Sequence, residues 1–369
     1  MQLQEMAKNK TVWLSGEGPE SEVVLSSRIR LARNISGKPF PARANRSIQQ
    51  EILNLVEETV KKQSMSEATF LNLSAPGGLD KIDRQFLMER HLISYEHAQA
   101  NFVRGVMIGP GEKISMMINE EDHLRLQSLE PGFALNNAWD NLNSLDDELA
   151  KFLPFAFSQQ WGFLTACPTN TGTGLRTSCL MHLPALVHSE EIEHVLQNLS
   201  KIGIVARGFY GEGTKVLGDF FQISNATTLG QTENEIVDNL SRVGKQIIDY
   251  EKKSRTKLLT ESITKTKTED TIYRAYGLLA NARTITYEET INHLSKIRLG
   301  IYLGLNLPVD INILNELLLL AQPAHLQEIA NKELSSTQRD VLRAEFIRQK
   351  LNKTTKNKID QKKINKNTT

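Results

Sequence analysis

The feature that most constrains the fold is a change in the character of the sequence near residue 254. Before this point, short strand-like runs alternate with amphipathic helical segments, whereas after it the strand-like runs stop. Hairpins combined with long helices are typical of an α+β domain with antiparallel pairing. We therefore predict an antiparallel sheet flanked by helices over residues 22–255, followed by an all-helical domain over residues 262–350.

Periodicity and turn signals predict the individual elements. A glycine-proline-glycine turn at residues 109–111 predicts a hairpin, and apolar residues at helical spacing predict the helices. The first predicted strand begins at residue 22, and the others cover 102–108, 113–118, 204–209 and 219–224. The predicted helices cover 48–63, 83–98, 136–149, 184–188, 192–202, 233–257, 269–280, 286–303, 311–321 and 337–350.

Charge is unevenly distributed along the chain. The whole chain has 44 lysines and arginines against 43 aspartates and glutamates, but residues 351–369 contain six lysines and one aspartate. The rest of the chain is therefore slightly acidic, and direct nucleic-acid binding is not expected. The tail has almost no apolar residues to bury, so we predict that residues 351–369 are disordered.

Simple counts exclude several classes of protein. The two cysteines, Cys167 and Cys179, are too few for a disulfide framework and form no CxxC pair for zinc. The apolar runs fall short of the ~20 residues that a membrane-spanning helix needs, and the N-terminus shows no signal-peptide core. We therefore expect a cytoplasmic protein without a membrane partner, in which residues 1–21 form an N-terminal segment.

A basic segment, SSRIRLAR at residues 26–33, follows the first strand-like run. Alternation along a strand puts Arg28 and Arg30 on the same face. Two like charges side by side repel each other unless an anion lies between them. This segment alone is equally compatible with an anion-binding site and with a solvated strand edge.

An acidic segment, NEEDHLR at residues 119–125, follows another predicted strand. Glu121 lies just after that strand, and Arg125 follows four residues later. A carboxylate held in this way is suited to act as a general base or a substrate clamp. The alternative is a helix N-terminus, where acidic residues favour the dipole, and the segment alone favours that alternative.

Two glycine-rich segments complete the set. CPTNTGTGLR at residues 167–176 is suited to a backbone turn packed close to a ligand, but it lacks the ending of a Walker A loop. RGFYGEG at residues 207–213 predicts a mobile loop that brings Glu212 onto a substrate. The alternatives are a small buried side chain for Cys167 and a surface hairpin with an incidental acid for Glu212.

Together these segments supply five arginines beside glycines, strand ends or acids. They are Arg28, Arg30, Arg125, Arg176 and Arg207. Arginine forks bind phosphate oxygens bidentately, and a triphosphate carries about four negative charges. Phosphoryl transfer needs mainly positioning and neutralisation of the charge on the transferred group. The combination is therefore suited to phosphoryl transfer without a P-loop.

The four segments, followed by ISNATTLGQTE at residues 223–233, resemble in type and order the landmarks of the phosphagen (ATP:guanidino) kinases. The resemblance extends over residues 22–250 and implies that family's catalytic fold, its use of ATP with Mg²⁺, and no metal ligands from the protein. The residues that it assigns to ATP are Ser27, Arg28, Ile29, Arg30, His91, Arg125, Arg176 and Arg207. It also implies that Glu121 and Glu212 grip the guanidinium and that Cys167 is a reactive cysteine beside it.

The chemistry of a guanidinium agrees with these roles. Its pKa lies above about 12, so its nitrogen lone pair is unavailable until a base accepts a proton. We interpret Glu121 as the base, because it follows a rigid strand, and Glu212 as the clamp, although the residues alone leave the choice open. Cationic groups nearby would favour a thiolate at Cys167.

Two departures from the family pattern concern the flanking regions. Free-guanidine kinases carry a helical domain before the first arginine segment, whereas only 25 residues precede Ser26 here, and those kinases lack the C-terminal helical domain. Both departures resemble the family's bacterial branch, which phosphorylates arginine side chains and thus implies protein substrates with exposed arginines. The alternatives are a kinase of free arginine and an inactive adaptor that binds phosphoarginine.

A fifth motif, RDVLRA at residues 339–344, lies in a predicted helix of the second domain. Arg339 and Arg343 share one helix face, and Asp340 can pair with Arg343; a solvated charged face is the alternative. The resemblance implies that Arg339, Asp340, Arg343 and Ala344 form an allosteric phosphoarginine pocket in a regulatory and dimerisation domain. It further implies a homodimer whose partners are an activator protein, a heat-shock repressor and the Clp protease machinery in a stress response.

Overall fold

The computed structural model of the chain describes residues 3–8, 11–62, 67–75, 78–208 and 216–366. The strands are β1 (Val24–Arg33), β2 (Thr69–Asn72), β3 (Gly105–Ile108), β4 (Ile114–Ile118), β5 (Leu124–Pro131), β6 (Phe157–Ser158), β7 (Gly162–Phe163), β8 (Leu175–His182), β9 (Ile204–Arg207) and β10 (Phe220–Asn225). The helices are α1 (Leu3–Lys8), α2 (Arg46–Lys62), α3 (Lys81–Glu89), α4 (Tyr95–Gln99), α5 (Leu135–Ala150), α6 (Pro184–His188), α7 (Ile192–Lys201), α8 (Glu233–Thr260), α9 (Ser262–Asn281), α10 (Tyr287–Tyr302), α11 (Ile311–Leu320), α12 (Pro323–Ala330) and α13 (Ser336–Lys366). Short 3₁₀ turns are η1 (Val12–Leu14), η2 (Pro41–Arg43), η3 (Pro110–Glu112) and η4 (Pro168–Asn170).

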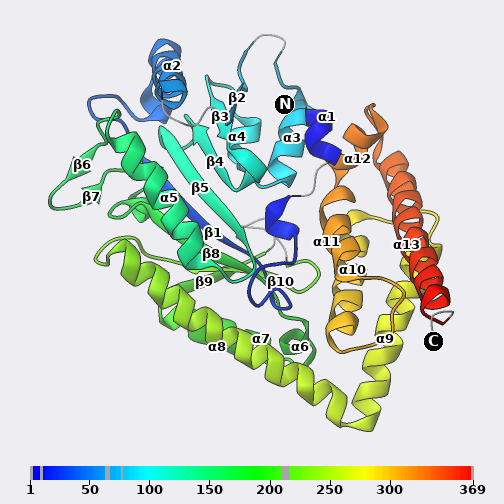
Figure 1. Ribbon diagram of the computed structural model, residues 1–369. Coiled ribbons are helices and arrows are strands. Elements are labelled where there is room, and N and C mark those ends of the chain that lie inside the picture. The colour runs from blue at the N-terminus through cyan, green and yellow to red at the C-terminus, as the bar shows by residue number, and fades with distance from the viewer. Residues whose placement is uncertain (1–2, 9–10, 63–66, 76–77, 209–215, 367–369) are drawn as a thin grey trace.

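Eight strands form one sheet in the order β2-β3-β4-β5-β1-β8-β10-β9, and β6 pairs separately with β7 (Figure 1). All pairings within the large sheet are antiparallel. Strand β1 lies between β5 and β8 in the middle of the sheet. The pair of β3 and β4 is the hairpin predicted around residues 109–111. An antiparallel sheet flanked by helices confirms the predicted fold class.

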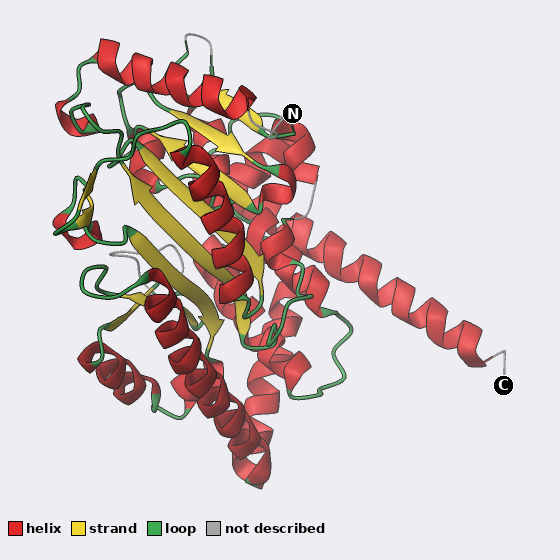
Figure 2. Cartoon of the chain, turned by 60° about the vertical axis from the view of Figure 1, so that its left-hand side comes forward, coloured by secondary structure: helices red, strands yellow, loops and turns green. Residues whose placement is uncertain are grey.

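Alternation along β1 gives the sheet two different faces. Ile29 and Leu31 are fully buried and belong to the main hydrophobic core. Helices α2, α5 and α8 contribute to the same core, and Figure 2 shows helices lying across the strands on one side. Arg28 and Arg30 alternate with these buried residues. They therefore lie on the opposite face, away from the main core.

The helices that follow α8 pack against one end of that opposite face. Helices α9, α10, α11 and α13 build a second hydrophobic cluster, which also contains the sheet residues Leu129, Leu180 and Phe220. Figure 1 shows these helices gathered on one side of the sheet. Helix α8 ends at Thr260 and α9 begins at Ser262, close to the predicted boundary. The helical region therefore shares a core with the sheet instead of folding as a detached unit.

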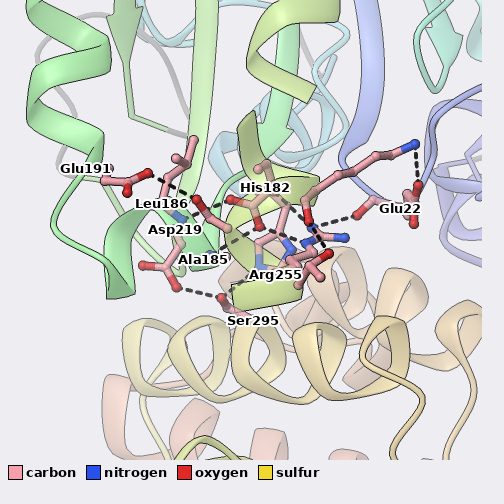
Figure 3. A network of polar contacts seen from close by, with 12 residues as sticks. Glu22, His182, Ala185, Leu186, Glu191, Asp219, Arg255 and Ser295 are labelled. Atoms are coloured by element: carbon pink, nitrogen blue, oxygen red, sulfur yellow. Dashed lines mark hydrogen bonds and ion pairs between the residues drawn. The ribbon is translucent and has the colours of Figure 1, made fainter. Parts of the chain in front are cut away.

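A buried polar network joins the two regions at the end of β8 (Figure 3). Ser295 of α10 donates from its hydroxyl to Asp219 Oδ2 at 2.9 Å and lies 2.8 Å from His182 Nε2. Because Ser295 uses its proton for Asp219, it accepts the second hydrogen bond from His182. Burial lowers the pKa of His182 well below its usual range, which keeps the ring neutral. Arg255 of α8 donates to the carbonyl oxygens of Glu22 at 3.1 Å and of His182 at 3.4 Å.

A second buried contact joins α12 to the end of α3. Glu89 is 1% exposed, and its carboxylate accepts from the backbone amides of Ala324 at 2.8 Å and His325 at 3.0 Å. It also contacts His325 Nδ1 at 2.8 Å. The first amides of a helix have no partner within the helix, and a carboxylate there also favours the helix dipole. One side chain of the sheet domain thus holds the start of a helix in the second region.

The structure differs from the predicted elements in three respects. The predicted helix over 83–98 is two helices, because Ser94 caps α4 by accepting from the amide of His97 at 3.0 Å. The sequence analysis predicts neither α1 nor α12, and it also misses strands β2, β5, β6, β7 and β8. Helix α13 continues to Lys366, through the tail predicted to be disordered, because lysines extend an established helix that no glycine or proline interrupts. No described helix is both long and apolar enough to cross a membrane.

Replacing Glu89 with alanine is expected to lower the free energy of unfolding by about 3 kcal/mol, because it leaves two amides and His325 buried without an acceptor. Urea unfolding followed by circular dichroism measures this change. Glu96→Ala, an exposed substitution in α4, is the matched control and should change stability by less than about 0.5 kcal/mol. Equal stability of the two variants would contradict the role assigned to Glu89.

Candidate functional site

The sheet register collects arginines on the face opposite the main core. Residues directly opposite each other in an antiparallel pair point to the same side. Arg176 of β8 lies directly opposite Arg30. Arg125 of β5 lies opposite Ala32, which follows Arg28 and Arg30 at the same two-residue spacing along β1. Four of the five predicted arginines therefore share one face at the middle of the sheet.

Arg207, the last of the five, reaches this face from β9. It pairs with Gln222 of β10, which in turn pairs with Leu180 of β8. Leu180 is an even number of residues from Arg176 and so points to the same side. All five side chains are half-buried. The structure thus brings together the arginines that the sequence assigned to phosphate, and we call these five residues the arginine face.

Four residues of the arginine face repel one another, namely Arg28, Arg30, Arg125 and Arg176. Burial, followed by the charges of Arg125 and Arg176, lowers the pKa of Arg28 to about 10. Burial and the neighbouring arginines, Arg28 foremost, lower the pKa of Arg30 well below its usual range. The pKa of a guanidinium falls only where its charged form is disfavoured. A polyanion bound here would relieve that cost, which gives this face a physical preference for phosphates.

Arg125 is held by a carboxylate that the sequence did not single out. Its Nη1 donates to Glu120 Oε1 at 2.7 Å and Oε2 at 2.8 Å. Glu120 also accepts from Ser94 Oγ at 2.7 Å and from the amide of Glu121 at 2.9 Å. Burial alone would raise the pKa of Glu120, but Arg125 and these hydrogen bonds lower it to about 2. Glu120, not Glu121, is therefore the acid that orients Arg125.

Glu121 lies exposed in the turn between β4 and β5, next to the arginine face. Asn170 Nδ2 donates to its Oε2 at 3.4 Å. Partial burial raises the pKa of Glu121; Arg125 and a hydrogen bond with Cys167 oppose this rise. The sequence of this segment alone favoured a helix N-terminus. In the structure the segment is instead the turn that connects β4 to β5.

Cys167 is held beside Glu121 by the next acid in the turn. Asp122 is 2% exposed and accepts from the amide of Ala166 at 2.7 Å and from Asn34 Nδ2 at 2.6 Å. This ties the loop that carries Cys167 to the turn that carries Glu121. The Cys167 thiol is half-buried, 3.0 Å from a threonine hydroxyl. The structure therefore brings together Glu121 and Cys167, two of the three residues predicted to act on the guanidinium.

The glycine-rich segment at 167–176 is anchored by Thr228. The hydroxyl of Thr228 contacts the carbonyl oxygens of Thr169 at 2.9 Å and Thr171 at 2.7 Å. Gly172 has a φ of +113°, and a Cβ atom there would lie 2.4 Å from the carbonyl oxygen of Thr228. Only glycine tolerates both conditions. The ISNATTLGQTE segment, which contains Thr228, therefore packs directly against the glycine-rich segment.

A narrow cleft opens on the arginine face beside Arg28. Its lining residues are Trp13, Ser26, Arg28, His91, Leu129, Ser178, Leu180 and Gln222. His91 follows α3 with a φ of +61°, and its carbonyl oxygen accepts from Gln127 Nε2. Burial, then Arg28 and Arg30, lower the pKa of His91 to about 3. The ring is therefore neutral at physiological pH and adds no charge to the cleft.

Several predicted residues are not part of this arrangement. The side chains of Ser27 and Ile29 lie on the opposite face of β1, fully buried among the residues of the main core. Arg33 also points there and pairs with Asp146 at 2.7 Å. Glu212 lies outside the described residues. Among the residues that are described, no group of three or more histidines, cysteines or acids could hold a metal ion.

The RDVLRA segment lies near the start of α13, far along the chain from the arginine face. Arg343 is 1% exposed and donates to backbone carbonyl oxygens at 2.7 and 2.9 Å, at the end of α11 and just before α10. It also pairs with Asp340, and Ala344 is buried beside it. Arg339 is half-buried and donates to the carbonyl oxygen of Leu334 at 2.7 Å. In this structure Arg343 fastens α13 to its neighbours.

Comparison with known protein families gives two matches along the chain. Residues 49–254 match the model of the ATP:guanido phosphotransferase C-terminal catalytic domain. Residues 265–362 match the model of the C-terminal domain of protein-arginine kinase McsB. The first match covers more than half of the chain and contains three of the four predicted segments. The second covers most of the helical region.

Comparison with individual proteins agrees with these matches. The chain is 46% identical to the protein-arginine kinase of Halothermothrix orenii, over 94% of this chain and 97% of that protein. It is 45% identical to that of Desulforamulus reducens, over 95% and 99%. Among solved structures it is similar to a lombricine kinase, with a TM-score of 0.57 and 26% identity over 64% of this chain and 68% of that one. It is also similar to the duplicated taurocyamine kinase of Schistosoma mansoni, with a TM-score of 0.55 and 28% identity over 66% and 34%.

These similarities are consistent with the site described above. Two of the matched solved structures are a lombricine kinase and a taurocyamine kinase, and two relatives that the chain matches over nearly their full length are protein-arginine kinases. The chain therefore belongs to the ATP:guanido phosphotransferase family, in its protein-arginine kinase branch.

Proposed function

We propose that this protein transfers the γ-phosphoryl group of ATP to arginine side chains of other proteins. The observation that carries the proposal is the arginine face, with the exposed Glu121 and the half-buried Cys167 in the loops beside it. Such a cluster of like charges suits a triphosphate, and the acid suits a guanidinium. Both substrates of the reaction thus have chemically matched groups on one side of the sheet.

The arginines hold the nucleotide in this proposal. Arg28, Arg30, Arg176 and Arg207 neutralise the phosphate oxygens, and Arg125 does so in an orientation fixed by Glu120. His91 lies on the base side of the cleft beside Arg28. Mg²⁺ would enter with the nucleotide and would neutralise part of the charge on the transferred phosphoryl group. The protein therefore supplies positioning and charge, the main requirements of phosphoryl transfer.

Glu121 acts as the general base. Its raised pKa favours proton uptake compared with an ordinary glutamate. As a guanidinium nitrogen attacks the γ-phosphorus, its proton passes to Glu121. The bond between the γ-phosphorus and the bridging oxygen breaks, and ADP leaves with the electron pair. Cys167 contacts the guanidinium beside Glu121, and Glu212, which lies outside the described residues, clamps its other side.

The choice of a protein substrate rests on the family branch. The relatives matched over more than 90% of their length are protein-arginine kinases, and the helical region matches a domain of such a kinase. The exposed position of Glu121 is compatible with an arginine presented on a protein surface. Free arginine as the acceptor and an inactive phosphoarginine-binding adaptor are the alternatives that the assay below distinguishes.

We also propose that the helical region over 262–350 regulates the kinase as a homodimerisation domain with a phosphoarginine pocket. Arg339 and Asp340 are half-buried near the start of α13 and would meet the ligand, while Arg343 and Ala344 form the buried base of the pocket. In this proposal the enzyme is cytoplasmic and marks proteins for Clp-type proteolysis during stress. An activator protein and a heat-shock repressor complete its partners.

Incubation with Mg-ATP and an arginine-rich protein is expected to give an acid-labile, base-stable phosphate on arginine. Glu121→Gln should lower the rate at least ~100-fold, because no base then accepts the guanidinium proton. Glu96→Gln, an exposed substitution in α4, is the matched control and should keep the full rate. Phosphorylation of free arginine without protein labelling would favour the small-substrate alternative, and no ATP consumption with any acceptor would favour the adaptor.

The two cysteines are expected to differ in their reaction with iodoacetamide under native conditions. Cys167 is half-buried and should be alkylated, whereas Cys179 is fully buried and burial raises the pKa of its thiol to about 12. Peptide mass spectrometry measures each modification, and the unfolded protein, in which both should react, is the control. Equal labelling of both residues in the native protein would contradict the site geometry.

A further inference from the structure

We propose that Trp13 contacts the nucleotide base and donates a hydrogen bond to it from the indole nitrogen. This inference rests on the proposed function, because it assumes that ATP occupies the cleft on the arginine face. It assigns a role in the site to a residue of the N-terminal segment, which the motifs do not include. It makes Trp13 a determinant of how ATP is distinguished from other polyphosphates.

Trp13 is built into the wall of the cleft by packing. It lies in η1, is 2% exposed, and lines the cleft together with Arg28 and His91. It belongs to the hydrophobic cluster shared by the sheet and the helical region. Leu129 and Leu180, which also line the cleft, belong to the same cluster. The indole is therefore fixed between the cleft and the second region and does not sample solvent.

The lining of the cleft combines charged, polar and apolar groups. Arg28 supplies the charge, whereas Trp13, Leu129, Leu180 and the neutral ring of His91 supply apolar surface. A nucleotide has the same division, because its phosphates are charged and its base is a flat aromatic ring. With the phosphates on the arginine face, the base would lie against this apolar surface, to which Trp13 contributes.

Trp13 and His91 form an ordered aromatic pair. Their ring centroids lie 4.9 Å apart and their planes meet at 84°, an edge-to-face geometry that aromatic rings prefer. His91 has a φ of +61°, so its position depends on such contacts. Trp13 therefore helps to orient His91, which the family resemblance assigns to ATP.

The indole nitrogen of Trp13 lacks an acceptor. Its Nε1 is buried, and no hydrogen-bond partner for it occurs among the described residues. Trp139 provides the contrast: it packs against the main core, and its Nε1 donates to Asn234 at 3.1 Å. A buried donor without a partner is costly, and native proteins rarely keep one without a purpose. A base acceptor in the cleft would satisfy it.

Trp13→Phe keeps an aromatic ring but removes the donor. Loss of one hydrogen bond should raise the KM for ATP about fivefold to tenfold and leave kcat within about twofold. The Kd of inorganic tripolyphosphate, which has no base, should stay unchanged. Trp139→Phe is the matched control and should alter neither constant. A calorimetric melting curve without ligand separates this effect from a loss of stability, which would weaken tripolyphosphate binding as well.

Fluorescence gives a second measurement that does not change Trp13. In the Trp139→Phe/Trp161→Phe double variant Trp13 is the only tryptophan, since the chain has three. ATP should shift its emission with the Kd found by calorimetry, whereas tripolyphosphate should not. An unchanged KM in Trp13→Phe, or emission that ignores ATP, would overturn this inference while leaving the proposed function intact. Failure of the wild-type protein to bind ATP at all would overturn the proposed function and this inference with it.

Discussion

Mutual repulsion among the guanidinium groups of Arg28, Arg30, Arg125 and Arg176 on one face of the sheet is the constraint on which the rest of this structure depends. Register fixes them there, because Arg30 and Arg176 are directly paired and Arg125 follows at the same spacing. Their charges and burial lower the pKa of Arg28 to about 10. A free protein tolerates such a face only if other parts of the fold supply the stability that it lacks. The opposite face does so, with Ile29 and Leu31 at the centre of the main core.

The surroundings of the arginine face divide its charge between structure and function. Glu120 neutralises Arg125 and fixes its direction, while Glu121 in the same turn stays exposed. The helical region packs against the sheet on the same side as the arginine face. It shares a hydrophobic cluster with Leu129, Leu180 and Phe220 of the sheet. Glu89 and Ser295 fasten that region at two buried points. Helices α10 and α12 are therefore in direct contact with the domain that carries the cleft.

Sequence reasoning predicts the parts of this site that follow from local periodicity and charge. Alternation along residues 26–33 is enough to put Arg28 and Arg30 on one face. The end of the strand-like runs near residue 254 locates the start of the helical region. It cannot tell Glu120 from Glu121, because the choice depends on how the β4–β5 turn directs each side chain. Nor does it detect Trp13, whose role depends on where a separate segment docks. Resemblance to a motif assigns whole segments, so it also included Ser27 and Ile29, whose side chains alternate away from the arginines.

Thermal unfolding of the wild-type protein and of Arg30→Met, each with and without inorganic tripolyphosphate, tests the account most directly. Methionine keeps the length and apolar stem of arginine but removes one charge from the centre of the arginine face. Without ligand the variant should be more stable than wild type by about 1 kcal/mol, because one repulsive charge is gone. Tripolyphosphate should raise the melting temperature of the wild-type protein strongly and that of the variant much less. A variant that is less stable without ligand and gains as much from tripolyphosphate would show that these arginines are not an anion site held under electrostatic repulsion.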